Sequence, residues 1–353
     1  MNYTGFDDII GHDRPKHIIS AFLERERMPH AFLFSGQEGI GKKKMAIAVA
    51  RRILCDTGKG CGVCRGCTRV SRMTHPDLIL LDRQHMEWAA QPQQKKAQND
   101  NTEKTREINT ISIDFIRGSE DKKIRGINQE VHKYPYEGKK RVIIIDDADN
   151  MTTEATNAFL KTLEEPPEFN LFFLITSRES DLPITIRSRC TRVSFCPLSQ
   201  AQLRQYFIDK LGIEKERARL LSYISNGSIN TGLFWLEGDN LNIRKRLGEF
   251  VLGRTKGFVE ATFLGEYISR GGRELSIYIS FLFSLFRDLY LIKKIKTRQG
   301  IINMDFVELL ERARYSMEAI DRGIQKIKET AGIMRYNINK WLMFENLILQ
   351  LKR

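Results

Sequence analysis

The chain has 353 residues, of which 41% are hydrophobic and 29% charged, as is ordinary for a soluble globular protein. This length predicts two or three domains. The net charge of +13 favours contact with a polyanion such as nucleic acid, or with an acidic partner, although a generally basic, solvated surface is the bland alternative.

Short apolar runs alternate with helical patterns in the first half of the chain. The expected strands are 31–35, 77–82, 141–149, 171–177 and 191–196. The stretch 45–54 has the apolar spacing of an amphipathic helix. A second helix is expected within 152–167, with Thr152 or Thr153 as its cap and two prolines at its end. Continuous apolar strands that alternate with helices predict a parallel sheet covered on both faces.

The rest of the chain lacks strand patterns. Residues 87–110 are polar and predict a solvated insertion loop. From residue 197 onward the apolar residues recur at helical spacing, which predicts a helical domain and then further helices. The run 275–292 has nearly the length of a membrane span, but it contains Arg287 and Asp288, which would be costly in lipid. We expect a buried helix there and, because the N-terminus shows no signal peptide, a cytoplasmic protein.

Four of the six cysteines lie within thirteen residues, in CDTGKGCGVCRGC, which favours a metal over disulfides. Their spacing can bring four thiolates onto one tetrahedral centre, and the glycines between them permit tight turns. Four thiolates leave no position for water, so the predicted ion is a structural zinc; an iron–sulfur cluster or free thiols are the alternatives. The predicted ligands are Cys55, Cys61, Cys64 and Cys67.

The sequence GQEGIGKKK, residues 36–44, has the form of a phosphate-binding loop between a strand and a helix. In a working loop the backbone N–H groups cradle phosphates, the lysine reaches the outer phosphates, and the next hydroxyl binds magnesium. Lys43 stands where that hydroxyl belongs, and a second ammonium would repel the metal. ATP binding is therefore doubtful. The candidate nucleotide residues are Gly36, Gly39, Gly41 and Lys42.

Acidic residues follow the apolar run 141–145, as in a Walker B segment. Asp146 could serve a metal ion, so we add it to the degenerate nucleotide site. Asp147 occupies the place where an active hydrolase has a glutamate to orient water, and its shorter side chain would sit back from that water. A merely polar strand end is the alternative. Thr176 and Ser177 end the next run, where such an ATPase places a polar sensor of the outer phosphate.

The sequence resembles the AAA+ clamp-loader subunits of the replicative DNA polymerase. The resemblance covers most of the chain and rests on motifs in the family's order: FDDIIGHDRPKHII, the PHAFLFSGQEGIGKKKMA block, the four cysteines, HPDL, IIIDDAD, NAFLKTLEEPP, LPITIRSRC and YNINKWLMFENLILQL. It implies an α/β AAA+ domain with a zinc-binding insertion, a small helical lid and an all-helical collar that assembles a ring. The expected bounds are 1–196, with the zinc module at about 51–75, then 197–239 and 240–353.

The departures from the family's pattern point to a subtype. Active loader subunits keep the loop hydroxyl, a Walker B glutamate and a second sensor arginine; here those positions hold Lys43, Asp147 and Asn230. The Ser188-Arg189-Cys190 triplet remains. In this family its arginine projects into the ATP site of the neighbouring subunit, where a positive charge stabilises the transferred phosphate. The alternative is that Arg189 is an ordinary surface or salt-bridged arginine with no role in a neighbouring ATP site.

The resemblance thus implies a non-catalytic subunit of a five-membered loader, with little ATPase of its own, that contributes to DNA synthesis within the polymerase holoenzyme, itself a nucleotidyltransferase. Its expected partners are gamma/tau and delta subunits, primer–template DNA and, weakly or not at all, the sliding clamp. Candidates for DNA contact include Lys122, Lys123 and Arg125, each of which could equally be a solvated surface residue. The alternatives are an active gamma/tau-like ATPase and another AAA+ protein of replication or recombination.

Overall fold

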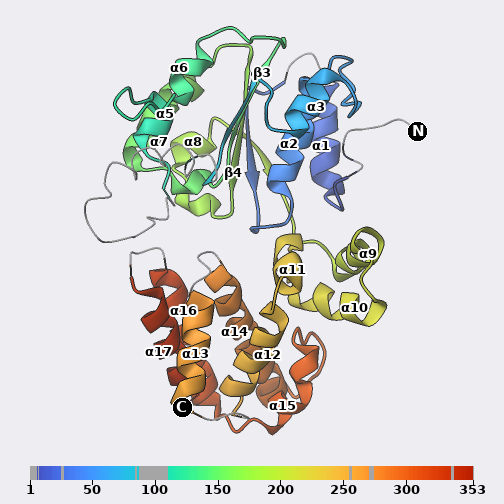
Figure 1. The fold of residues 1–353 in the computed structure, drawn as a ribbon, viewed down its shortest axis with the longest axis vertical. Coiled ribbons are helices and arrows are strands. Elements are labelled where there is room, and N and C mark those ends of the chain that lie inside the picture. The colour runs from blue at the N-terminus through green and yellow to red at the C-terminus, as the bar shows by residue number, and fades with distance from the viewer. Residues whose placement is uncertain are drawn as a thin grey trace. The chain divides into compact units, whose positions relative to one another are not determined.

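The structure is a computed structural model. It describes residues 6, 8–24, 28–83, 86, 110–253, 257–269, 274–334 and 338–352. The chain divides into two compact units, Met1–Leu198 and Ser199–Arg353 (Figure 1). The polar insertion predicted at 87–110 falls almost wholly outside the described residues. The division of the second unit into a lid at 197–239 and a collar at 240–353 stays a prediction.

The first unit contains a parallel five-stranded sheet in the order β2-β3-β4-β1-β5. Each expected strand is present, although the polar residues at the carboxyl ends of three runs lie beyond the strands. The strands are β1 (Ala31–Ser35), β2 (Leu78–Leu81), β3 (Arg141–Ile145), β4 (Asn170–Thr176) and β5 (Thr191–Ser194). The predicted parallel α/β sheet is therefore confirmed.

Helices cover both faces of this sheet (Figure 1). On one side lie α1 (Asp13–Leu23), α2 (Lys42–Ile53) and α3 (Arg65–Ser71), and on the other α5 (Ile113–Arg117), α6 (Ile127–Val131), α7 (Thr153–Glu164) and α8 (Ile184–Arg187). Successive strand side chains point to opposite faces. Accordingly, Phe173 belongs to the core on the α2 side, and its neighbours Phe172 and Leu174 to the core on the α7 side.

The helix predicted within 152–167 forms as α7, and its cap is Thr152. The Thr152 hydroxyl accepts a hydrogen bond from the amide of Ala155 at 3.1 Å, which satisfies one of the unpaired donors of the first turn. Short 3₁₀ turns, η1 (Ala148–Asn150) and η2 (Glu179–Asp181), follow β3 and β4. These turns lie at the carboxyl ends of the strands, where the candidate nucleotide site is expected.

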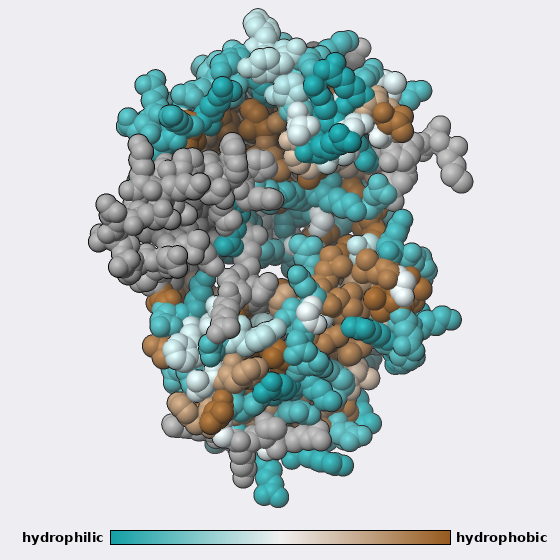
Figure 2. Space-filling view, in the orientation of Figure 1, coloured by the Kyte–Doolittle hydropathy of each residue, from teal (hydrophilic) through white to brown (hydrophobic). Residues whose placement is uncertain are grey.

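The second unit consists of helices in its described parts. They are α9 (Gln200–Leu211), α10 (Lys215–Ile224), α11 (Ile229–Leu236), α12 (Asn240–Val251), α13 (Phe258–Ser269), α14 (Glu274–Tyr290), a π-helical turn η3 (Leu291–Ile295), a 3₁₀ turn η4 (Met304–Phe306), α15 (Val307–Arg312), α16 (Met317–Ile333) and α17 (Lys340–Leu351). Figure 2 shows hydrophobic side chains gathered on the visible face over α9 to α11, and Leu211 and Leu233 are among the exposed residues of these helices.

The apolar run predicted as a buried helix forms α14 and continues into η3. Leu275–Ile295 is long and apolar enough to cross a membrane by length and composition, and half of its most apolar window is buried inside this unit. The charges within it have polar partners. Asp288 is fully buried and accepts hydrogen bonds from the amide of Asn303 at 2.8 Å and from Arg287 at 3.2 Å. These partners favour a core helix, since a charge in lipid would lack them.

Candidate functional site

The candidate nucleotide site lies where several parallel strands end. Gly36 follows β1, Asp82 follows β2, Asp146 follows β3, and Thr176 is the last residue of β4. Carboxyl ends of parallel strands share one edge of a sheet, so these four residues belong to the same edge, where ligands of open α/β sheets bind.

The loop after β1 has the backbone shape of a phosphate loop. Gly36 has φ +149°, and a Cβ there would approach the Phe195 carbonyl oxygen to 2.4 Å, so only glycine fits. Gly39 and Gly41 have φ values of +75° and +108°, in the region that glycine tolerates. The predicted glycines thus shape the turn from β1 into α2.

Lys42 folds back onto this loop. Its ammonium donates to the carbonyl oxygens of Gly36 at 2.5 Å and Gln37 at 2.6 Å. The side chain is buried, and this burial lowers the pKa of Lys42, against the raising effect of the Asp146 charge. A phosphate that bound here would have to compete with these two carbonyl groups for the ammonium.

Lys43 takes the position of a cation between two carboxylates. Its ammonium forms an ion pair with Asp82 and lies 3.4 Å from the Oδ2 atom of Asp146. In a working loop the next residue supplies a hydroxyl to magnesium, and the Walker B aspartate helps hold that ion. Here the residue at the hydroxyl position is Lys43, and its ammonium contacts Asp82 and the Walker B residue Asp146. Lys43 thus pairs directly with both carboxylates, and the expected repulsion of a metal stays a prediction.

Sequence reasoning gave no role to Asp82. The signal was present, since Asp82 is an acid directly after an apolar strand that pairs with the Walker B strand. Burial raises the pKa of Asp146, as does the nearby charge of Asp147, while Lys43 acts to lower it. Asp147 itself has a left-handed backbone with φ +52°.

The predicted sensor position is held in a network of its own. The Thr176 hydroxyl donates to Asp149 at 2.7 Å and accepts from the amide of Arg178 at 3.0 Å. The Arg178 guanidinium in turn donates to Asp149 at 2.8 Å and to Asn150 at 2.7 Å. These bonds fix Thr176 to the turn after β3.

Arg189 lies after α8 and just before β5. Its guanidinium donates to the Thr185 carbonyl oxygen at 2.9 Å and to Glu164, the last residue of α7, at 2.8 Å. The pair is accessible, because the side chain of Arg189 is 34% exposed and that of Glu164 50%. In this single chain Arg189 is therefore a salt-bridged surface arginine, which was the alternative to an arginine finger. Its side chain remains accessible to a second molecule.

The two neighbours of Arg189 differ in accessibility. The Ser188 hydroxyl donates to the Thr185 carbonyl oxygen at 3.1 Å. Cys190 packs against the core on the α7 side, and burial raises the pKa of its thiol to about 12. A neutral, buried thiol of this kind supports the turn and is a poor nucleophile.

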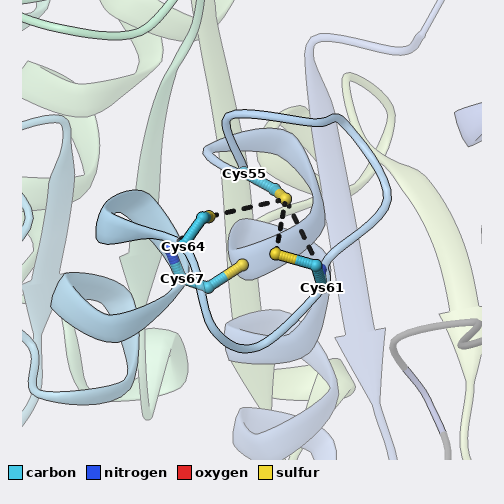
Figure 3. Close-up of side chains that lie close together, drawn as sticks. All are labelled: Cys55, Cys61, Cys64 and Cys67. Atoms are coloured by element: carbon cyan, nitrogen blue, oxygen red, sulfur yellow. Dashed lines mark hydrogen bonds between the residues drawn. The ribbon is translucent and has the colours of Figure 1, made fainter.

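The four predicted zinc ligands come together (Figure 3). Cys55 and Cys61 lie on the loop after α2, while Cys64 caps α3 and Cys67 lies in its first turn; their ligand atoms are all within 4.8 Å of one another. The Sγ atom of Cys55 is 3.7 Å from those of both Cys61 and Cys64. Zinc–sulfur bonds of about 2.3 Å in a tetrahedron place sulfurs about 3.8 Å apart, so the cluster fits this ion.

Hydrogen bonds lower the pKa of Cys55 and Cys61 in the cluster, whereas burial raises that of Cys67. Burial acts to raise the pKa of Cys55, but the hydroxyl of Thr57 and the amide of Cys61 outweigh it and lower that pKa to about 5. The amide of Cys67 also donates to the sulfur of Cys64 at 3.3 Å. A deprotonated sulfur is the form that binds a metal.

A buried aspartate ties the chain after the zinc module to the sheet. Asp77, of the HPDL motif, is fully buried and accepts hydrogen bonds from the amides of Tyr136 at 2.6 Å, Glu137 at 2.8 Å and Gly138 at 2.8 Å. Glu137 in turn binds Arg69 of α3 at 2.6 Å. The module is thereby joined to the segment that leads into β3.

A sequence profile described as "DNA polymerase III, delta subunit" matches residues 11–199, more than half of the chain. The chain belongs to this family. The matched span contains the phosphate loop, the four cysteines and Arg189. The resemblance to clamp-loader subunits is thus confirmed at the level of the DNA polymerase III delta', gamma and tau family.

Two relatives found by sequence agree with this assignment. DNA polymerase III subunit delta' of Bacillus subtilis is 26% identical over 340 residues, which cover 94% of this chain and 93% of the relative. Subunit tau of Escherichia coli is 30% identical over 236 residues, 65% of this chain and 32% of tau. A solved gamma subunit-related protein of Thermotoga maritima aligns over 96% of this chain and 99% of its own with a TM-score of 0.46 and 18% identity.

Proposed function

We propose that this chain is the non-catalytic delta' subunit of a DNA polymerase III clamp loader and has little or no ATPase activity of its own. The observation that carries the proposal is the position of Lys43, whose ammonium pairs with Asp82 and lies 3.4 Å from Asp146. Magnesium-dependent hydrolysis needs a metal at such a site, and the ammonium competes with it there. The full-length similarity to a delta' subunit supports the same assignment.

The second part of the proposal concerns Arg189. We infer that Arg189 leaves Glu164 and completes the ATP site of an adjacent gamma or tau subunit. Its side chain is 34% exposed, and its partner is an exposed carboxylate, so this ion pair contributes about 0 to 1 kcal/mol. Stabilisation of charge on a transferred phosphate can exceed this cost, since an arginine supplied in trans accelerates the reaction roughly 10³- to 10⁵-fold in the best cases.

The remaining expectations belong to the same proposal. Residues 240–353 would form the collar that joins gamma/tau and delta subunits into a ring, and residues 197–239 would form the lid. The complex would be cytoplasmic, would act on primed DNA and would contact the sliding clamp weakly through this subunit. Asn230, near the start of α11, is exposed and lacks the positive charge of a second sensor arginine.

The test is an ATPase assay on a loader reconstituted with wild-type chain or with Arg189→Ala. We expect the variant to assemble into the complex. The rate of DNA-stimulated ATP hydrolysis should fall by at least the contribution of one ATP site. Arg192→Ala is the control, because Arg192 is a nearby exposed arginine paired with Glu179 at 2.9 Å. Unchanged hydrolysis with Arg189→Ala would refute the role of this arginine, and tight magnesium-dependent ATP turnover by the isolated chain would favour the gamma/tau-like alternative.

A further inference from the structure

A basic cleft of about 510 Å³ lies within the second unit, apart from the residues discussed above. It is bounded by the end of α12, by the link between α15 and α16, by the first turns of α16 and by the residue after α17. The charged residues that line it are all basic: Arg312, Arg314, Arg322 and Lys352. Among the described residues no acidic side chain lines the cleft.

The link between α15 and α16 begins where the helix ends. Ala313 leaves the helix with an extended backbone, with φ −62° and ψ 132°. Arg312 and Arg314 are exposed, whereas Ala313 is buried. Both arginines line the cleft.

Tyr315 fixes this link in place. Its hydroxyl lies 2.6 Å from the carbonyl oxygen of Val251, near the end of α12, and 2.9 Å from that of Leu351, at the end of α17. Its ring packs edge-on against Phe286, with 5.7 Å between centroids. One half-buried side chain therefore holds together three of the segments that form the cleft, so the cleft is a built feature of the unit.

The arginines of the cleft differ from others in the same unit. Arg244 pairs with Asp305, and Arg246 pairs with Glu260 at 2.9 Å. Within the part of the chain that the structure describes, Arg312, Arg314 and Arg322 have no acidic partner within ion-pair distance, and Lys352 lies over the ring of Phe250. Like charges around one cavity repel each other, so an anion that enters it gains attraction from each of them.

We propose that this cleft binds the phosphate backbone of nucleic acid. Of the apolar residues that line it, Val251, Leu252 and Ala313 are buried and the small Ala319 is partly buried, so the cleft lacks the large exposed apolar anchors on which peptide recognition relies. Binding of a phosphate backbone needs only arranged positive charges, and guanidinium groups bind phosphate oxygens in pairs. The net charge of +13 suits the same ligand. This inference is independent of the role proposed for Arg189.

The experiment measures binding of the full chain to a labelled single strand and to a labelled primer–template duplex by fluorescence anisotropy, between 50 and 200 mM salt. The triple variant Arg312→Ala/Arg314→Ala/Arg322→Ala should bind about tenfold or more weakly at low salt. Its plot of log affinity against log salt should be shallower by about 2 to 3, because each lost phosphate contact removes about 0.7 to 0.9 from the slope. The triple variant Arg312→Lys/Arg314→Lys/Arg322→Lys keeps the positive charges, so it should keep most of the slope of log affinity against log salt.

The matched control is Arg204→Ala/Arg217→Ala/Arg219→Ala, which removes the same charge from exposed positions of α9 and α10 in the same unit. The control should keep the wild-type slope. Wild-type binding by the cleft variant, or an equal loss in both variants, would overturn the proposal. If labelled polyglutamate binds through the cleft and DNA does not, the ligand is an acidic protein segment and the proposal fails. Should the triple variant misfold, Arg314→Gln alone should lower the slope by about one, and an unchanged slope would count against the cleft.

Discussion

Replacement of Lys43 by threonine tests whether the lysine ammonium stands in for a metal ion. Lys43 forms an ion pair with Asp82 and lies 3.4 Å from Asp146. The substitution Lys43→Thr removes the cation and restores the hydroxyl that a working phosphate loop carries. Two carboxylates then face each other with no positive charge between them unless an ion enters.

The size of the effect follows from the burial of the three groups. Removal of one partner from a fully buried pair costs about 3 to 5 kcal/mol of folding free energy. The side chains of Asp82 and Asp146 are 8% and 20% exposed, but that of Lys43 is 36% exposed. Solvent therefore screens part of the interaction, and we expect a loss of about 1 to 3 kcal/mol without magnesium, or a fall of about 3 to 10 °C in the Tm of the first unit.

Magnesium should return part of this stability to the variant only. An ion that binds the folded state with a Kd of about 1 mM adds about 1.4 kcal/mol at 10 mM. The assay is thermal unfolding of the full chain over a magnesium titration at constant ionic strength. Wild type should not respond, nor should the control Lys44→Thr, which removes a neighbouring exposed lysine of the same helix.

The cost of Lys43→Thr should also depend on pH. Burial raises the pKa of Asp146 above its usual value, and Lys43 opposes this rise. Without Lys43 the pKa of Asp146 rises further in the folded state. A folded state that binds the proton more tightly loses stability as pH rises from the unfolded pKa, about 3.9, to the folded pKa, and stays level above it. The difference between variant and wild type should therefore shrink as the pH falls below neutrality.

Two outcomes would contradict this reasoning. If Lys43→Thr is as stable as wild type without magnesium, the ammonium does not neutralise the two carboxylates. If the variant loses stability but does not respond to magnesium, Asp82 and Asp146 are a structural pair and have no latent capacity for a metal. After the second outcome the proposal that the chain lacks ATPase activity would still stand. Competition between Lys43 and a metal ion would no longer explain it.

Three further changes have defined expected results. Glu164→Gln weakens the hold on Arg189, so ATPase activity of the reconstituted loader should rise by at most about fivefold, the limit for an exposed pair, and no rise should occur when Arg189→Ala is also present. Freshly purified chain should carry one zinc by elemental analysis; Cys64→Ser should lose it, while Cys196→Ser, outside the cluster, should keep it. Asp77→Ala leaves three amides without their acceptor and should cost about 3 kcal/mol or more in denaturant unfolding, against a small effect for Asp56→Ala on the exposed surface.

The sheet could be predicted because its central strands are nearly continuous apolar runs. Runs such as VIII in β3 and LFFLI in β4 are buried on both faces, and only a central parallel strand needs apolar residues at every position. The metal site of the four cysteines could also be predicted, since all four ligands lie close together in the sequence. In both cases the signal lies within a few consecutive residues.

Partners that come from distant parts of the chain were beyond the sequence pattern. Lys43 and Asp82 are 39 positions apart, and Arg189 and Glu164 are 25 apart. Their meeting depends on strand order in one case and on the packing of α7 against α8 in the other, which local periodicity does not encode. The arginine cleft was missed for the same reason, because its other walls come from the ends of α12 and α17, which are distant in the sequence.

The proposed absence of metal chemistry and the presence of the glycine loop can have a common physical cause. A glycine-rich turn that evolves without a metal still leaves carboxylates at the ends of β2 and β3, and buried charges without partners are costly. A lysine at position 43 supplies a permanent counter-charge from within the chain, so the fold no longer needs an ion to stabilise that edge of the sheet. Unlike a bound ion, this counter-charge cannot leave the site. A variant with threonine at this position should consequently depend on magnesium for its stability before it gains any capacity to hydrolyse ATP.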